Sequence, residues 1–127
     1  MGVFRHTVEI GNPAGDRFEE ISAVVDTGAT YTVVPVSVLR GLGVEPRETI
    51  ELSLADGTVI ERDLGQTWAR IDGKDVITIV IFGDDDAEPL LGAYTLEGVR
   101  LAPDPVNERL VPTRALLLRQ SAPGAGE

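Results

Sequence analysis

The sequence predicts a single all-β domain with one or two short helices. Its 127 residues correspond to one domain, and 43% hydrophobic and 25% charged residues are typical of a globular chain. Short segments of alternating apolar and polar residues, separated by Gly, Pro, Asn and Asp, are typical of strands and turns. We assign the domain to residues 1–120 and predict a disordered tail over residues 121–127, SAPGAGE.

The N-terminal third contains three predicted strands. Val3–Ile10 forms the first, which ends at the turn residues Gly11-Asn12-Pro13. Phe18–Val25 forms the second, with apolar residues at every other position near its end. Val33–Pro35 is the third strand, and Val36–Gly41 is predicted to be a helical turn that Gly41 and Gly43 close.

Two hairpins are predicted next. Residues 49–54 alternate cleanly, and Asp56-Gly57 before the run Val59–Arg62 is a strong hairpin signal. Trp68–Ile71 and Val76–Phe82 flank a second Asp-Gly turn. The run VITIVIF within the second hairpin does not alternate, so it predicts a strand covered on both faces.

The C-terminal third is predicted to contain the second helix. Ala93–Glu97 follows Pro89-Leu90-Leu91-Gly92 and is expected to end at Gly98. The later apolar segments are Val99–Leu101, Leu110–Val111 and Ala115–Leu118, with a turn over Ala102–Asn107.

Composition excludes several classes of function. The net charge of -10 argues against binding nucleic acid or anionic membranes. The absence of cysteine excludes disulfides, a thiol nucleophile and a Cys-based zinc site, and the single His6 disfavours a histidine cluster or a Ser/His hydrolase. No signal peptide is recognisable in MGVFRHTVEIGNP and no run is long enough to span a membrane, so we expect a cytoplasmic protein.

The acidic run Asp84-Asp85-Asp86-Ala87-Glu88 has two interpretations. Its carboxylates are the ligand type that Ca²⁺ prefers. The run lacks the alternating spacing of a calcium loop, so a solvated acidic loop is the favoured interpretation. We therefore predict neither a metal site nor a cofactor.

The stretch AVVDTGATYTVVP, residues 23–35, places one carboxylate between two apolar segments. One interpretation is a plain turn, because Asp and Gly are common turn residues. The other is a functional carboxylate at the floor of the structure, because an apolar strand precedes Asp26 and Tyr31–Val34 returns directly to the core. A carboxylate in such a place needs hydrogen bonds, which Thr27 and Gly28 would donate.

This stretch resembles the active-site loop of the aspartic proteases, in which two apolar residues precede Asp-Thr/Ser-Gly-Ala/Ser and an apolar pair follows. Val24–Ala29 and then Val33-Val34 match that pattern. Leu90-Leu91-Gly92 with its helix is similar to the family's second motif, and the hairpin over residues 50–62 is similar to its flap. The order of motifs resembles the small, single-domain, retropepsin-like (clan AA) type of bacteria and archaea.

The resemblance implies a closed β-barrel with a flap, acting on extended peptides without a cofactor. It also implies a homodimer, because the family's chemistry needs two aspartates and this chain has one Asp-Thr-Gly. Asp26 of each protomer would then activate the water, Thr27 and Gly28 would complete the catalytic loop, and each Thr27 would bond across the twofold axis. The residues that would bind substrate are Ala29 and, at the flap tip, Ala55, Asp56, Gly57 and Thr58.

Some residues depart from the family pattern. The flap tip is not glycine-rich, and Ala93 and Tyr94 stand where viral enzymes carry a group that braces the dimer. The terminal segments Val3–Ile10 and Ala115–Leu118 would form an intersubunit sheet or complete the chain's own sheet. Three functions therefore stand: an aspartic endopeptidase, the same fold as a peptide-binding or dimerising module without efficient cleavage, and a structural protein in which Asp-Thr-Gly is only a turn.

Overall fold

The computed structural model describes residues 3–115, and these form the predicted all-β domain. Its strands are β1 (Arg5–Gly11), β2 (Phe18–Val25), β3 (Thr32–Pro35), β4 (Glu48–Ser53), β5 (Val59–Ile71), β6 (Lys74–Gly83), β7 (Leu90–Leu91), β8 (Leu101–Asp104) and β9 (Arg109–Pro112). Its helices are α1 (Val36–Gly41) and α2 (Ala93–Val99). The last predicted apolar segment lies largely, and the predicted tail entirely, outside the described residues.

The main sheet closes into a barrel. Its strand order is β1-β2-β7-β3-β6-β5-β4, and β1 also pairs with β5 at Glu9↔Arg70 and Ile10↔Ala69. The ring therefore consists of β1, β2, β7, β3, β6 and β5, while β4 extends one side of it as the outer strand of a hairpin. Closure pairs β1 with β5 and leaves β4 as the strand of this sheet with a free edge.

The shortest strand, β7, connects the two halves of the sequence. Leu90 and Leu91 pair in parallel with Val24 and Val25 of β2, and Leu90 also pairs with Val33 of β3. This insertion brings the loop that follows β2 next to the loop that follows β7. The Asp-Thr-Gly sequence and Gly92 therefore meet at one end of the barrel.

The barrel interior and the inner faces of the helices form one apolar core. Alternating positions of the strands point into it, as their sequence pattern predicts. Its most deeply buried apolar side chains are Val8, Ile10, Ala23, Val34, Leu39, Ala69, Ile71, Val80 and Leu91, with Leu96 and Val99 contributed by α2.

Several predicted details are wrong. β5 runs unbroken through residues 59–71 and carries both hairpins, and the stretch predicted to be covered on both faces leaves Ile77 48% exposed. Gly98 does not end the second helix. A Cβ there would lie 2.8 Å from Cγ2 of Val76, so Gly98 allows α2 to pack closely on β6, and the left-handed cap is Arg100 with φ 58°. The last turn is shorter than predicted, because β8 includes Ala102.

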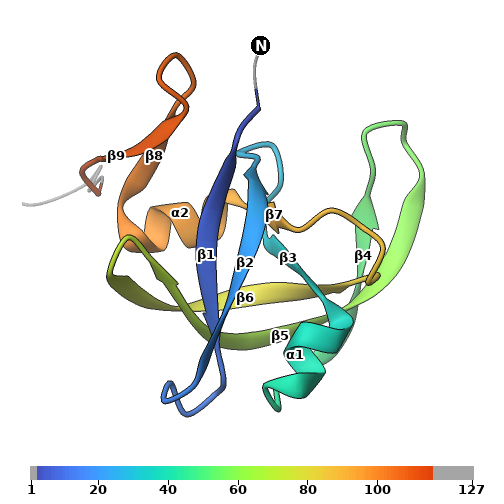
Figure 1. The fold of residues 1–127 in the computed structure, drawn as a ribbon. Coiled ribbons are helices and arrows are strands. Elements are labelled where there is room, and N and C mark those ends of the chain that lie inside the picture. Colours follow the sequence, from blue (N-terminus) through green and yellow to red (C-terminus); the bar gives the residue numbers. More distant parts are fainter. Residues whose placement is uncertain (1–2, 116–127) are drawn as a thin grey trace, which may run out of the picture.

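Three elements project from the same side of the barrel as the end of β2 (Figure 1). They are the N-terminal segment, the hairpin of β4 and β5, and the separate hairpin of β8 and β9. The helix α1 lies at the opposite end. None of the helices within residues 3–115 has the length and apolarity needed to cross a membrane.

Candidate active site

Asp26 begins a tight loop directly after β2. Its backbone N–H donates to the Leu91 carbonyl at 3.0 Å, and its own carbonyl accepts the Ala29 N–H at 3.1 Å. The Gly28 N–H donates to Oδ1 of the Asp26 carboxylate at 2.9 Å, as the sequence predicts for one of the two donors. The side chain is half-buried rather than fully buried, so solvent and a ligand can reach it.

The segment after β7 fastens this loop to α2. The Ala93 N–H donates to the Ala29 carbonyl at 2.8 Å, and the Tyr94 N–H donates to the Thr30 carbonyl at 2.9 Å. Gly92 has no room for a side chain, because a Cβ would lie 2.5 Å from the Tyr31 carbonyl oxygen and 2.9 Å from that of Ala29. Only glycine fits at this crossing of two backbones.

A chain of three buried threonines supports the loop from below. The Gly92 N–H donates to Oγ1 of Thr32 at 3.1 Å, and the Thr32 and Thr95 hydroxyls lie 2.6 Å apart. The Thr95 hydroxyl also lies 2.8 Å from that of Thr78 on β6. All three threonines are at most 1% exposed, so the network satisfies groups that burial would otherwise leave without partners.

These three threonines are not among the site residues predicted from the sequence. Their available signal was a hydroxyl inside an apolar run, Thr32 before Val33-Val34 and Thr78 within VITIVIF. A polar side chain at a core position needs a hydrogen-bond partner, which marks it as part of a network. The sequence could not show which hydroxyls pair, because Thr32 and Thr95 are 63 residues apart.

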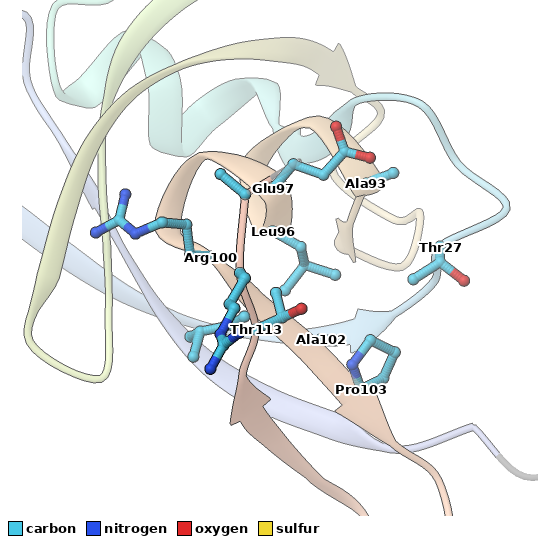
Figure 2. A pocket seen from close by; sticks show the side chains of 11 residues that line it. Thr27, Ala93, Leu96, Glu97, Arg100, Ala102, Pro103 and Thr113 are labelled. Carbon is cyan, nitrogen blue, oxygen red and sulfur yellow. The ribbon is translucent and has the colours of Figure 1, made fainter. Parts of the chain in front are cut away.

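Thr27 is exposed and borders a hollow beside the loop. Within residues 3–115 its hydroxyl has no hydrogen-bond partner, so the predicted donation to Asp26 is not seen within one chain. The hollow has a volume of about 610 Å³. Figure 2 shows it between α2 and the strand β8, with Thr27 at one side and Arg100 at the other.

The predicted flap is the hairpin of β4 and the first part of β5. Its turn is closed by the Leu54 N–H donating to the Thr58 carbonyl at 2.7 Å, and Gly57 adopts φ 87° there. The side chain of Thr58 and then its backbone N–H, 2.9 Å from Oδ1 of Asp56, hold the pKa of Asp56 below its ordinary value. Ala55–Thr58 are all exposed, and among the described residues no hydrogen bond joins them to the Asp26 loop.

The acidic loop before β7 has structural contacts. Oδ1 of Asp85 accepts the Ser37 N–H at the start of α1 at 2.9 Å, and Asp84 pairs with Arg62 at 3.2 Å. Over residues 3–115 there is no group of three or more side chains placed to hold a metal ion. These contacts tie the acidic loop to the helix and to β5.

The family model for gag-polyprotein putative aspartyl protease matches residues 17–98. The matched region contains the Asp26 loop, the flap and Gly92 with most of α2. The chain belongs to this family. This match confirms the resemblance to retropepsin-like aspartic proteases that the sequence predicted.

Among solved structures, the chain is similar to the protease of Simian Foamy Virus (mac), determined in solution. The two share 24% sequence identity over 69% of this chain and 86% of the viral one, with a TM-score of 0.49. No curated protein matches the chain. The family match ends at Gly98, so β8 and β9 lie outside the part that this chain shares with the family model.

Proposed function

We propose that the protein is a homodimeric aspartic endopeptidase in which Asp26 of each protomer activates one water. The observation that carries this proposal is the construction of the Asp26 loop. The carboxylate is half-buried at an open end of the barrel, on a backbone fixed by β7 and α2. Oδ1 accepts one hydrogen bond from Gly28, and within the described residues Oδ2 accepts none, which leaves it available to a water or a partner carboxyl.

The chemistry requires two such loops. Two carboxyl groups in contact share one proton, because like charges at that distance raise the pKa of one group and lower that of the other. The ionised carboxylate takes a proton from the water as its oxygen attacks the peptide carbonyl carbon, and the protonated one donates to the carbonyl oxygen. The resulting diol collapses as the amide nitrogen receives a proton and the C–N bond breaks. One chain supplies half of this arrangement.

Exposed apolar side chains support a second copy at this end of the barrel. Val3 is 68% exposed, Leu54 43%, Val59 55% and Val106 88%. They belong to the three elements that project beside the Asp26 loop (Figure 1). A copy related by a twofold axis through the loop would remove such groups from water on both chains at once.

The flap supports an extended peptide as the substrate. Within the described residues β4 pairs only with β5, so its other edge has free backbone donors and acceptors. An extended chain can add to such an edge as a strand, with its side chains entering alternate pockets. The predicted contacts of Ala29 and of Ala55–Thr58 with substrate belong to this proposal, and a cytoplasmic location stays a prediction.

The decisive experiment compares wild type with Asp26→Asn on a mixed peptide library from pH ~4 to ~8. We expect wild type to cleave and Asp26→Asn to be inactive, because Asn keeps the size of the side chain but cannot share the catalytic proton. Asp85→Asn is the matched control, since it makes the same change at a loop away from the site, and it should retain activity. Cleavage that survives Asp26→Asn would exclude this site. No cleavage by a dimeric wild type would favour the peptide-binding module.

A mixing experiment tests whether the site is shared. After subunit exchange with an equal amount of Asp26→Asn, a fixed amount of wild type should retain about half of its activity, because half of the dimers then carry one carboxyl group. Unchanged activity would mean that each chain acts alone.

A further inference from the structure

Two tyrosines lie at the surface next to the Asp26 loop. Tyr31 is the last residue before β3, and Tyr94 is the second residue of α2. Their rings form an aromatic pair, with centroids 5.8 Å apart and planes tilted by 55°. Tyr94 is 48% exposed and Tyr31 is half-buried, so the pair is open to solvent rather than packed in the core.

The backbone ties both tyrosines to the segment that carries Asp26. The Tyr94 N–H donates to the Thr30 carbonyl at 2.9 Å. The Tyr31 carbonyl oxygen lies so close to Gly92 that a Cβ there would be 2.5 Å from it. The contacts that hold the Asp26 loop therefore also hold the aromatic pair, and a pair held in advance loses little conformational entropy when it binds a ligand.

Half-buried apolar side chains lie on the same face of the sheet as the Asp26 carboxylate. Leu90 of β7 is in register with Val24 of β2 and with Val33 of β3, so these three side chains point to one face. The residue after each of them is at most 6% exposed and packs in the core, so this face is the outer one. The Asp26 N–H continues the ladder between β2 and β7 by donating to the Leu91 carbonyl, which places Asp26 on the face of Val24.

This apolar surface continues toward the flap. Ile81 of β6 is in register with Val33 and with Leu64 of β5, and Leu64 pairs with Glu48 at the base of the flap hairpin. Ile81 and Leu64 are only 2% and 7% exposed, yet they lie outside the buried cluster of the barrel interior. An apolar strip therefore runs from the Asp26 loop to the base of the flap, and it consists of Val24, Leu90, Val33, Ile81 and Leu64.

The tyrosine pair stands at the edge of this strip, some way from Asp26. Tyr31 is two residues before Val33, and Thr32 between them is fully buried, so Tyr31 continues the outer face. Because β7 separates β2 from β3, Tyr31 lies roughly 10 Å across the sheet from Asp26. Side chains on one face of an extended peptide repeat every ~7 Å. The pair is therefore placed for a side chain beyond the two residues that flank the cleaved bond.

We propose that Tyr31 and Tyr94 form a subsite for an aromatic side chain of the peptide, away from the cleaved bond. The apolar strip disfavours a charged side chain, because burying a charge without a partner is costly. The two rings add stacking or edge-to-face contacts that an aliphatic side chain cannot make. This inference rests on the proposed function and names its substrate class. Since Tyr94 departs from the family pattern, the preference belongs to this chain rather than to the family.

A peptide series in which one Phe moves through every position of an otherwise constant, alanine-rich sequence tests the subsite. At one position beyond the flanking residues, Phe should raise kcat/KM about tenfold over Ala. Tyr94→Ala should reduce this ratio to about twofold, because one ring of the pair is lost, whereas Tyr94→Phe keeps the ring and should retain it. Ile77→Ala is the control, since Ile77 is equally exposed but pairs with Trp68 on β5, and it should leave the ratio unchanged.

Binding separates this inference from the proposed function. Asp26→Asn should bind the same peptides without cleaving them, and fluorescence anisotropy should give the same preference in Kd. Cleavage that does not depend on where Phe stands, or a preference that survives Tyr94→Ala, would overturn the subsite and leave the endopeptidase intact. Binding with the aromatic preference but no cleavage by a dimeric wild type would support the subsite and remove the endopeptidase. Neither binding nor cleavage would remove both.

Discussion

The Asp26 loop and the flap turn both connect strands of one sheet, but they are held in different ways. Backbone hydrogen bonds from β7 and α2 fix the Asp26 loop, and buried threonines support it from below. The flap turn depends on its own bonds between Leu54 and Thr58, with every tip side chain exposed. Regions with few buried contacts open at a lower free energy than the core. The same sheet thus provides one loop that several elements hold and one turn that is held only by its own hydrogen bonds.

The largest expected effect on stability comes from adding a methyl group at Gly92, where two backbone segments cross. In Gly92→Ala the new Cβ would lie 2.5 Å from the Tyr31 carbonyl oxygen, and the obstacle is backbone that cannot rotate away. We expect the free energy of unfolding to fall by about 3 kcal/mol, and activity to be lost because the two loops separate. Urea denaturation measures the change. Gly41→Ala is the control, because a Cβ there meets nothing within 4 Å. Equal stability of the two variants would contradict this role of Gly92.

The next largest effect on stability is expected when the same substitution, threonine to valine, is made in the two regions. Thr95→Val keeps the side-chain shape but leaves the buried Thr78 hydroxyl without its partner and Thr32 with only the Gly92 N–H, which costs about 1–3 kcal/mol. Thr58→Val in the exposed flap turn should change stability by less than about 0.5 kcal/mol. Thr95→Ser restores the hydroxyl and should recover most of the loss. If both valine variants unfolded at the same urea midpoint, the threonine chain would not support the loop.

The smallest expected effect is a change in stability at acid pH when Asp56 is replaced. The pKa of Asp56 is lower in the folded protein than its ordinary 3.8, chiefly because of Thr58, so its ionised form favours the folded state. That contribution is present above about pH 4 and is lost as the pH falls through the folded pKa. Asp56→Asn should therefore be slightly less stable than wild type at pH ~7, and the difference should shrink as the pH falls below about 4. Urea midpoints across this range measure it, and a difference independent of pH would show that the turn bond does not act through ionisation.

The sequence predicted the local elements well where one local signal dominates. Phe18–Val25 and Val36–Gly41 have the predicted bounds, and the Asp56-Gly57 turn closes the predicted hairpin. Two predictions were wrong: the role of Gly98, because glycine can either end a helix or allow close packing, and the burial of Asp26. Gly98 was interpreted as a helix end, but its lack of a side chain serves packing against Val76. Asp26 was expected at a buried floor, but the structure leaves it half-exposed.

Local patterns in the sequence account for most of the strands and turns, the absence of cysteine chemistry and the Asp-Thr-Gly loop that leads to the family. These are local properties, set by alternation, turn residues and the order of short motifs. Contacts between distant segments produce the pairing of β1 with β5, the need for glycine at Gly92, the threonine chain and the hollow beside Thr27. Each joins segments distant in the sequence, and local propensity carries no information about which buried groups will meet when the chain closes on itself.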